Sequence, residues 1–219
     1  MNNTKATNKG ITIKVKPKDD HVLVTDKGLV IQRQGKPVSI QQAESGYVYL
    51  LLDCSSSMDS WDKMKQAKSG ALNFTQSALN DRYSVGLIEF NTFASTLCEP
   101  TRDLKSLNHH INSLYAYGST NMAEAITLAQ QQLINKSGFL VMVIITDGEP
   151  NSRTDTLVEA DKAKKNNIDI ITVGTDDADE SFLSMLASRS DLVKVVPRNN
   201  LARSIASTAN LLPIPRTVD

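Results

Sequence analysis

The chain has few cysteines and no excess of charge of either sign, and both features narrow the class of protein. Its two cysteines, Cys54 and Cys98, are too few and too isolated for a disulfide framework, so we expect a reduced, cytoplasmic setting. Lysine plus arginine and aspartate plus glutamate each number 24, which gives a formal net charge of zero. A neutral chain offers no global electrostatic reason to bind nucleic acid or an anionic membrane.

Long apolar runs and familiar catalytic motifs are also missing. Residues 1–10 are polar, so the apolar core of a secretory signal is not expected there. No apolar run approaches the roughly 20 residues that a membrane-spanning helix needs. The sequence contains no G-x-S-x-G elbow, no G-x-x-x-x-G-K-[ST] loop and no H-E-x-x-H pair, which are signatures of common hydrolases and nucleotide-binding proteins. We therefore expect a soluble protein that is not an enzyme.

What is present divides into two patterns near Gly46. Residues 1–46 form an extension that is expected to be partly disordered and then β-prone, because short apolar pieces alternate with charged and glycine-containing breakers. Residues 47–212 alternate apolar strands with amphipathic helices, and residues 213–219 form a tail that begins with a helix-stopping proline. This alternation predicts an α/β fold with a doubly wound, mostly parallel sheet and helices on both faces.

The strands and helices can be placed by their apolar spacing. In the first helical segment apolar residues recur every three or four positions from Trp61 to Ala78, while Lys63, Lys65 and Lys68 fall between them, so Trp61 is expected in the core. Further helices are expected near 122–133, 157–163, 182–186 and 201–212. The strand candidates are Tyr47–Leu52, Ser84–Phe90, Phe139–Thr146, Ile168–Val173 and a last edge strand at Asp191–Val196.

Three loops next to these elements carry side chains with oxygen atoms. Asp53, Ser55 and Ser57 follow the first strand, Thr120 lies before the second helix, and Asp147 follows the strand that ends at 146. If the strands are parallel, all three loops open on the same edge of the sheet, where ligands collect in such folds. Carboxylate and hydroxyl oxygens suit a hard divalent cation. One cation could therefore be shared by the three loops.

Each segment also has a simpler interpretation. Residues 55–57 could be helix N-caps, and Ser56 with Asp59 has the spacing of a capping box. Thr120 could cap the helix that follows it, and Asp147 with the next glycine is an ordinary turn pair. Taken singly, these structural roles compete well with metal binding. Their coincidence in three loops favours the shared site.

The order of these segments resembles the metal-ion-dependent adhesion site of von Willebrand factor type A (vWA) domains. The matching residues are Asp53-x-Ser55-x-Ser57, Thr120 in a Gly-Ser-Thr-Asn context, and Asp147 followed by glycine after an apolar strand. Similar landmarks continue through residues 85–91, 144–150 and 173–174, so the resemblance covers about residues 47–212. It implies a Rossmann-like vWA fold of the bacterial or intracellular type, and it leaves the extension unexplained.

The resemblance also implies a role for each site residue. Ser55, Ser57 and Thr120 would be direct ligands of Mg²⁺ or Mn²⁺, while Asp53 and Asp147 would mainly orient the outer shell. Neutral hydroxyls leave the cation's charge poorly neutralised, so a carboxylate from a partner can complete the octahedron.

A metal-dependent protein-protein interaction module is therefore the expected function. Its partner would offer a Glu or Asp carboxylate within an intracellular multi-protein assembly, such as one containing an AAA+ ATPase, and we expect neither a nucleic acid nor a membrane partner. Two alternatives remain open: a metal-dependent hydrolase with Glu149 or Asp59 as the base that activates a metal-bound water, and a structural scaffold whose site is unused. Ser56 and Ser119 stand where many relatives have glycine, which affects the rim of the site.

Overall fold

The computed structural model describes residues 45–215 with their side chains, and before them only the backbone of five short strands. Ser45–Pro215 form one compact unit. The disorder expected at the start of the extension, and residues 216–219 of the expected tail, lie outside the described residues. The five strands before the compact unit make one antiparallel pair, β1 (Lys5–Asn8) with β2 (Ile11–Lys14), and one antiparallel three-stranded sheet, β3 (Leu23–Val24), β4 (Leu29–Ile31) and β5 (Ile40–Gln42).

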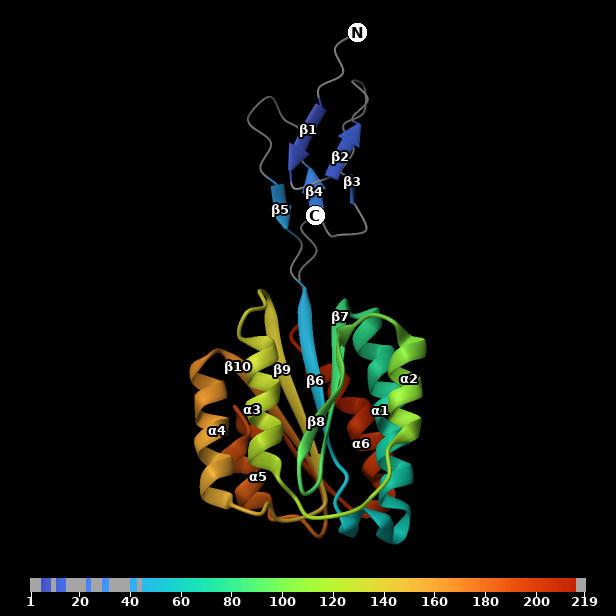
Figure 1. The fold of residues 1–219 in the computed structure, drawn as a ribbon, viewed down its shortest axis with the longest axis vertical. Coiled ribbons are helices and arrows are strands. Elements are labelled where there is room, and N and C mark those ends of the chain that lie inside the picture. The colour runs from blue at the N-terminus through green and yellow to red at the C-terminus, as the bar shows by residue number, and fades with distance from the viewer. Residues whose placement is uncertain are drawn as a thin grey trace. The chain divides into compact units, whose positions relative to one another are not determined.

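The compact unit is built on a six-stranded sheet with the strand order β11-β10-β9-β6-β7-β8 (Figure 1). Every pairing in this sheet is parallel except that of β8 with β7. The expected doubly wound, mostly parallel α/β fold is thereby confirmed. The strands are β6 (Gly46–Asp53), β7 (Tyr83–Phe90), β8 (Ala94–Thr101), β9 (Phe139–Thr146), β10 (Ile168–Thr175) and β11 (Val193–Val196).

Strand β6 lies at the centre of the sheet and is buried on both faces. Its alternate residues belong to two different cores: Leu50 faces one and Leu51 the other. A strand covered on both sides has to be apolar throughout, which explains the continuous run that ends at Asp53. Gly86 on β7 makes room for the ring of Tyr49, because a Cβ atom there would lie 2.3 Å from that ring. The central strand is thus tightly packed along its length, and this packing fixes the position of Asp53 at its end.

Helices cover the two faces of the sheet in sets of three. One set packs on the core that contains Leu50, and the other packs on the core that contains Leu51 (Figure 1). The first set is α1 (Lys63–Asn80), α2 (Leu104–Ser113) and α6 (Leu201–Ser207), and the second is α3 (Met122–Leu133), α4 (Arg153–Lys165) and α5 (Glu180–Leu186). Short 3-10 segments occur at η1 (Ser56–Asp62), η2 (Ser190–Leu192), η3 (Arg198–Asn200) and η4 (Thr208–Leu211).

The sequence-based placement of most elements is confirmed, and two details are wrong. Trp61, expected in the core, is 73% exposed. Trp61 and Asp62 both adopt left-handed backbone conformations, with φ of 58° and 56°. This interrupts the helical spacing just before α1, so Trp61 turns away from the stripe that begins at Met64. Lys63, expected between the apolar positions on the outer face, is instead only 4% exposed.

The two ends of the compact unit lie at the same edge of the sheet. Gly46, the first residue of β6, pairs with Tyr83, the first residue of β7. The hydroxyl of Tyr83 donates a hydrogen bond of 2.6 Å to the carbonyl of Pro213. The start of β6 and the segment after α6 are therefore neighbours, at the edge where the parallel strands begin.

Within the described residues, no helix combines the length and the apolar character that crossing a bilayer would require.

Candidate metal centre

Asp53 is buried at the point where β6 ends. One of its carboxylate oxygens accepts a 2.8 Å hydrogen bond from the backbone N–H of Ser55, and the other accepts a 2.6 Å bond from the hydroxyl of Thr146 at the end of β9. Burial raises the pKa of Asp53 to about 6, although the hydrogen bonds from Ser55 and Thr146 act in the opposite direction. The carboxylate is therefore fixed in orientation but poorly compensated in charge.

Ser55 and Ser57 turn their hydroxyl groups toward each other and toward Asp147. The two hydroxyl oxygens are 3.0 Å apart, and that of Ser57 donates a 2.7 Å hydrogen bond to Asp147 Oδ1. Ser55 stands at the N-cap position of η1 but makes no side-chain cap hydrogen bond. Helix capping therefore does not account for these hydroxyls, which are engaged with each other and with the third loop.

The backbone of Thr120, in the second loop, is held by the side chain and the backbone of Asn151. The N–H of Thr120 donates to the side-chain oxygen of Asn151 at 2.9 Å, and the N–H of Asn151 donates to the carbonyl of Thr120 at 2.9 Å. The N-cap of α3 is Asn121, whose side chain accepts from the N–H of Glu124. Thr120 is thus positioned without capping the helix. Within the described residues, its own hydroxyl makes no hydrogen bond.

The first and second loops are joined at Gly118. Its carbonyl accepts bonds from the N–H of Ser56 at 3.1 Å and from the hydroxyl of Ser56 at 3.0 Å, and the N–H of Tyr117 donates to the carbonyl of Cys54 at 2.7 Å. Gly118 has a φ of +76°, and a Cβ atom there would lie 2.5 Å from the hydroxyl oxygen of Thr92. A larger residue would strain this junction. The hydroxyl of Ser56 adds a side-chain hydrogen bond to this link between the loops.

Lys63 brings a buried positive charge to the third loop. Its ammonium group lies 2.5 Å from Asp147 Oδ2 and 3.0 Å from Asp177, and the side chains of Lys63 and Asp147 are 5% and 0% exposed. Burial alone would lower the pKa of Lys63, but the hydrogen bonds and charges of Asp147 and Asp177 outweigh burial and raise it. Because the pKa is raised above its ordinary value of 10.5, this ion pair stabilises the fold at neutral pH and is lost only as pH rises beyond that value.

The chemistry of these groups fits a hard divalent cation. Within the described residues, no three His, Cys, Asp or Glu side chains form a metal-binding group, so a metal here has to rely on hydroxyl oxygens. Ser55 and Ser57 supply two hydroxyls beside the carboxylates of Asp53 and Asp147. Asp53 is 1% exposed and has no salt bridge to the cationic groups of the described part of the chain. A divalent cation would offset the cost of burying that charge.

The structure brings the predicted residues together to different degrees. Direct hydrogen bonds connect Ser55 to Asp53 and link Ser55, Ser57 and Asp147 in a row. Thr120 is connected to this group through the backbone of its own loop, by way of Gly118. Lys63, Thr146 and Asn151, which the sequence analysis did not assign to the site, hold Asp147, Asp53 and Thr120 respectively.

The two residues considered as catalytic bases lie in less favourable surroundings. Glu149 is exposed, and both of its carboxylate oxygens are bound by the guanidinium of Arg153. Asp59 is exposed on η1, in a shallow surface region that it shares with Asp62 and Lys65. Neither carboxylate makes a hydrogen bond to the five predicted metal-site residues within the described part of the chain.

Comparison with known structures identifies the same fold in several solved proteins. The manganese-loaded TRAP protein of Plasmodium vivax is 18% identical over 75% of this chain and 72% of that one, with a TM-score of 0.64. The protein BatB from Bacteroides thetaiotaomicron is 20% identical over 76% of this chain and 98% of that one, with a TM-score of 0.65. At these identities the comparison shows the fold alone.

A third similar structure is proximal thread matrix protein 1 from the mussel byssus, solved with zinc in its metal-ion-dependent adhesion site. It is 16% identical over 77% of this chain, with a TM-score of 0.65, and this chain spans 46% of its length. Comparison with curated protein sequences finds no significant match.

The family model of the von Willebrand factor type A domain matches residues 48–208. This range includes all three loops of the candidate site and all but the first two residues of the central sheet. Since the match covers well over half of the chain, the protein belongs to the von Willebrand factor type A domain family.

Proposed function

We propose that the protein is a metal-dependent protein-protein interaction module. Ser55, Ser57 and Thr120 bind Mg²⁺ or Mn²⁺ directly, while Asp53 and Asp147 orient the ligands and the metal-bound water around the ion. The cation then takes a Glu or Asp carboxylate from a partner. The observation that carries the proposal is the hydrogen-bonded row of Ser55, Ser57 and Asp147 beside the buried carboxylate of Asp53.

The charges of the site favour an incoming carboxylate. Asp53, Asp147 and Asp177 contribute three negative charges. Lys63, shared by Asp147 and Asp177, and Arg198, in contact with Asp177, contribute two positive charges. The immediate surroundings therefore carry one net negative charge, which leaves a divalent cation under-neutralised. A hard cation that keeps part of its water shell has coordination positions that a carboxylate oxygen can occupy.

The solved neighbours support divalent metal binding as a property of this fold. The Plasmodium protein contains manganese and the mussel protein contains zinc. The proposal that the partner belongs to an intracellular assembly, such as one built around an AAA+ ATPase, rests on the family resemblance. In this proposal the partner is neither a nucleic acid nor a membrane.

Isothermal titration of chelator-treated protein with Mg²⁺ and Mn²⁺ tests metal binding. Ser57→Ala removes a proposed ligand, and Ser56→Ala is the matched control, because Ser56 is the adjacent exposed serine and its hydroxyl contacts the carbonyl of Gly118. We expect saturable binding by the natural protein and by Ser56→Ala, and loss of affinity of at least about tenfold in Ser57→Ala. Absence of binding in the natural protein, or equal binding by both variants, would contradict the proposal.

A further inference from the structure

The exposed aromatic side chains of this protein are confined to the surroundings of the candidate metal site. The sequence contains five phenylalanines, five tyrosines and one tryptophan, none of them in residues 1–44 or 216–219. Four are exposed: Trp61 (73%), Phe93 (69%), Tyr115 (63%) and Tyr117 (42%). The other seven are buried or half-buried. Scattered apolar residues on a surface are normal, whereas a set gathered around one site marks an interaction surface.

Hydrogen bonds place Tyr117 and Phe93 beside the candidate metal-binding loops, and the chain itself places Trp61 there. The backbone N–H of Tyr117 donates to the carbonyl of Cys54, between Asp53 and Ser55. Phe93 follows Thr92, whose hydroxyl accepts a 3.3 Å bond from the N–H of Ser119. Trp61 lies two residues before Lys63, the residue that holds Asp147. The rings therefore come from three different loops that meet at one edge of the sheet.

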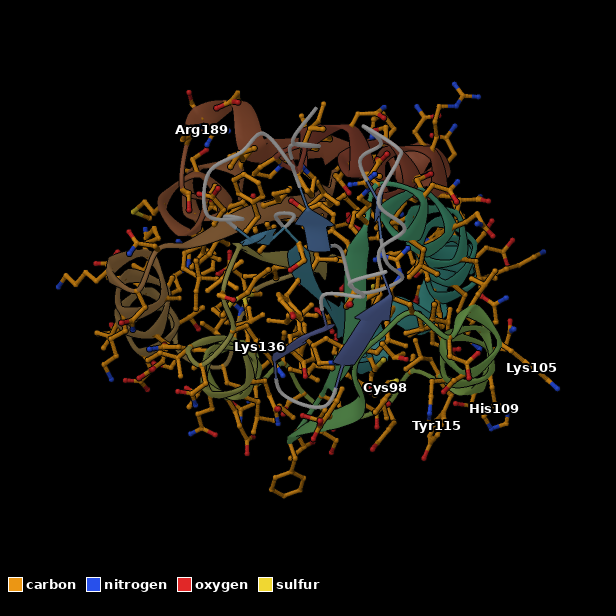
Figure 2. The ribbon with its side chains drawn as sticks, turned by 90° about the horizontal axis from the view of Figure 1, so that it is seen from above. Cys98, Lys105, His109, Tyr115, Lys136 and Arg189 are labelled. Atoms are coloured by element: carbon orange, nitrogen blue, oxygen red, sulfur yellow. The ribbon has the colours of Figure 1, made fainter. Side chains whose placement is uncertain are left out.

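Three of the four exposed aromatic rings make contacts within the protein. Tyr115 and Tyr117 stack with 4.8 Å between ring centres and an interplanar angle of 19°, and Tyr115 projects outward beyond α2 (Figure 2). The guanidinium of Arg198 lies 5.4 Å from the centre of the Trp61 ring. Preset tyrosine and tryptophan rings provide large contact areas with little loss of side-chain freedom, which is why such residues dominate binding interfaces.

We infer that Trp61, Phe93, Tyr115 and Tyr117 form an aromatic rim that selects which acidic residue the metal binds. The rim accepts a segment of a partner protein in which one Glu or Asp is flanked by bulky apolar side chains. The carboxylate reaches the cation while its neighbours cover the exposed rings. This inference rests on the proposed metal-dependent function and specifies the partner that the same site takes.

The charges around the rim favour such a segment over a polyanion. Asp59 and Asp62 are exposed near Trp61 and share their surface region with Lys65 and Lys68, so this region offers a chain of phosphates no excess of positive charge. A single carboxylate neutralised by the cation, with apolar groups on either side, needs no such excess. Burial of apolar area against the rings then adds affinity that the metal contact alone does not supply.

Three peptides test the inference with the full-length, Mn²⁺-loaded protein. Each has one central residue: glutamate flanked by leucines, glutamate flanked by serines, or glutamine flanked by leucines. Affinity is measured by isothermal titration and by the fluorescence of Trp61, the only tryptophan. We expect the leucine-flanked glutamate peptide to bind at least tenfold more tightly than either of the other two.

A rim variant and a matched control test whether the leucine preference comes from the aromatic rings or from exposed apolar residues elsewhere on the surface. Tyr115→Ser combined with Tyr117→Ser should reduce the leucine preference to less than threefold and leave Mn²⁺ affinity unchanged. Ile134→Ser combined with Val158→Ser, which changes two exposed apolar residues of other elements, should leave the preference intact. Unchanged Mn²⁺ affinity also shows that the rim variant is folded.

The outcomes distinguish this inference from the proposed function. Mn²⁺-dependent binding of both glutamate peptides with equal affinity overturns the aromatic rim and leaves the carboxylate partner standing. Equal binding of the glutamate and glutamine peptides, or Mn²⁺ binding without binding of either glutamate peptide, overturns the carboxylate partner and the rim with it.

Discussion

The two sides of the candidate metal site are held by different forces. On the charged side, Lys63 connects Asp147 to Asp177, and Arg198 contacts Asp177 at 3.1 Å. On the neutral side, Thr120 is fixed by two hydrogen bonds of 2.9 Å to Asn151, one to its side-chain oxygen and one from its backbone N–H. The charged side fixes a carboxylate by a buried ion pair. The neutral side fixes a hydroxyl residue without any ionised group.

This difference assigns a separate task to each side. The ion pair neutralises Asp147 and so limits how much of the cation's charge the protein itself can balance. The amide contacts hold Thr120 while leaving its hydroxyl uncommitted among the described residues. In the proposed function, the charged side therefore sets how strongly the metal attracts a carboxylate, and the neutral side, with Phe93 and Tyr117 nearby, sets what surrounds that carboxylate.

The largest expected effect comes from breaking the charged side with Lys63→Met. Removal of one partner of a buried ion pair leaves Asp147 buried and uncompensated, so the free energy of unfolding of metal-free protein should fall by roughly 3 kcal/mol. Mg²⁺ should restore part of this loss, because the cation supplies the missing positive charge. Chemical denaturation with and without Mg²⁺ measures both. Lys65→Met, on the exposed surface of the same helix, is the control, and an equal loss in the two variants would contradict the prediction.

The next effect comes from the hydroxyl that orients Asp53. Thr146→Val keeps the shape of the side chain but removes the 2.6 Å hydrogen bond to Asp53. Because residues that orient metal ligands commonly affect affinity by about 10–100-fold, Mn²⁺ affinity should fall within that range. Isothermal titration measures the change, and Thr146→Ser, which retains the hydroxyl, should stay close to the natural protein. Full affinity in Thr146→Val would show that Asp53 needs no such support.

A smaller effect is expected on the neutral side. Asn151→Ala removes the oxygen that accepts the N–H of Thr120, so the free energy of unfolding should fall by about 1 kcal/mol, as is typical for one hydrogen bond. Metal affinity should fall as well, because the position of Thr120 becomes less restricted. Asn151→Asp keeps an acceptor oxygen and should lose less stability than Asn151→Ala in chemical denaturation. A greater loss of stability in Asn151→Asp than in Asn151→Ala would show that the acceptor oxygen of Asn151 does not support the site.

The smallest effect is expected from the exposed part of the charged side. Glu149→Gln removes the negative charge that pairs with Arg153. The side chain of Glu149 is 52% exposed and that of Arg153 is 44% exposed. Solvent and salt screen such a pair, so the denaturation midpoint and the Mn²⁺ affinity should not change measurably. A loss approaching that of Lys63→Met would show that the charged side acts as one network rather than through its buried pair.

Much of the fold could be predicted from the sequence because its signals are local. All five predicted strands lie within two residues of their observed bounds. Four of them are easy to recognise because buried parallel strands are continuous apolar runs. Strand β8 was not predicted. It is the antiparallel edge strand, is only partly buried, and pairs with β7 through two irregularities. Such a strand has neither a continuous apolar run nor regular alternation.

The candidate site could be predicted in part for a similar reason. The five proposed metal-site residues lie in loops that the sequence places next to predicted strands and helices. Lys63, in contrast, is one of several lysines in a predicted helix, and nothing in the sequence distinguishes it from the others. Its partners Asp147 and Asp177 are 84 and 114 residues away, so only the fold shows that this lysine is buried. Asn151 follows a proline in a turn and resembles an ordinary loop residue. A side chain that acts through a distant partner leaves no local pattern.

The position of Gly46 and Pro213 has a mechanical consequence. Both lie where the parallel strands begin, joined through Tyr83, while the metal-binding loops follow the ends of those strands. A segment attached at either end of the domain is therefore joined to it at the edge opposite the candidate metal-binding loops. Tension applied between the two ends would act across the contact of Tyr83 with Pro213, at the edge of the sheet away from the candidate metal-binding loops.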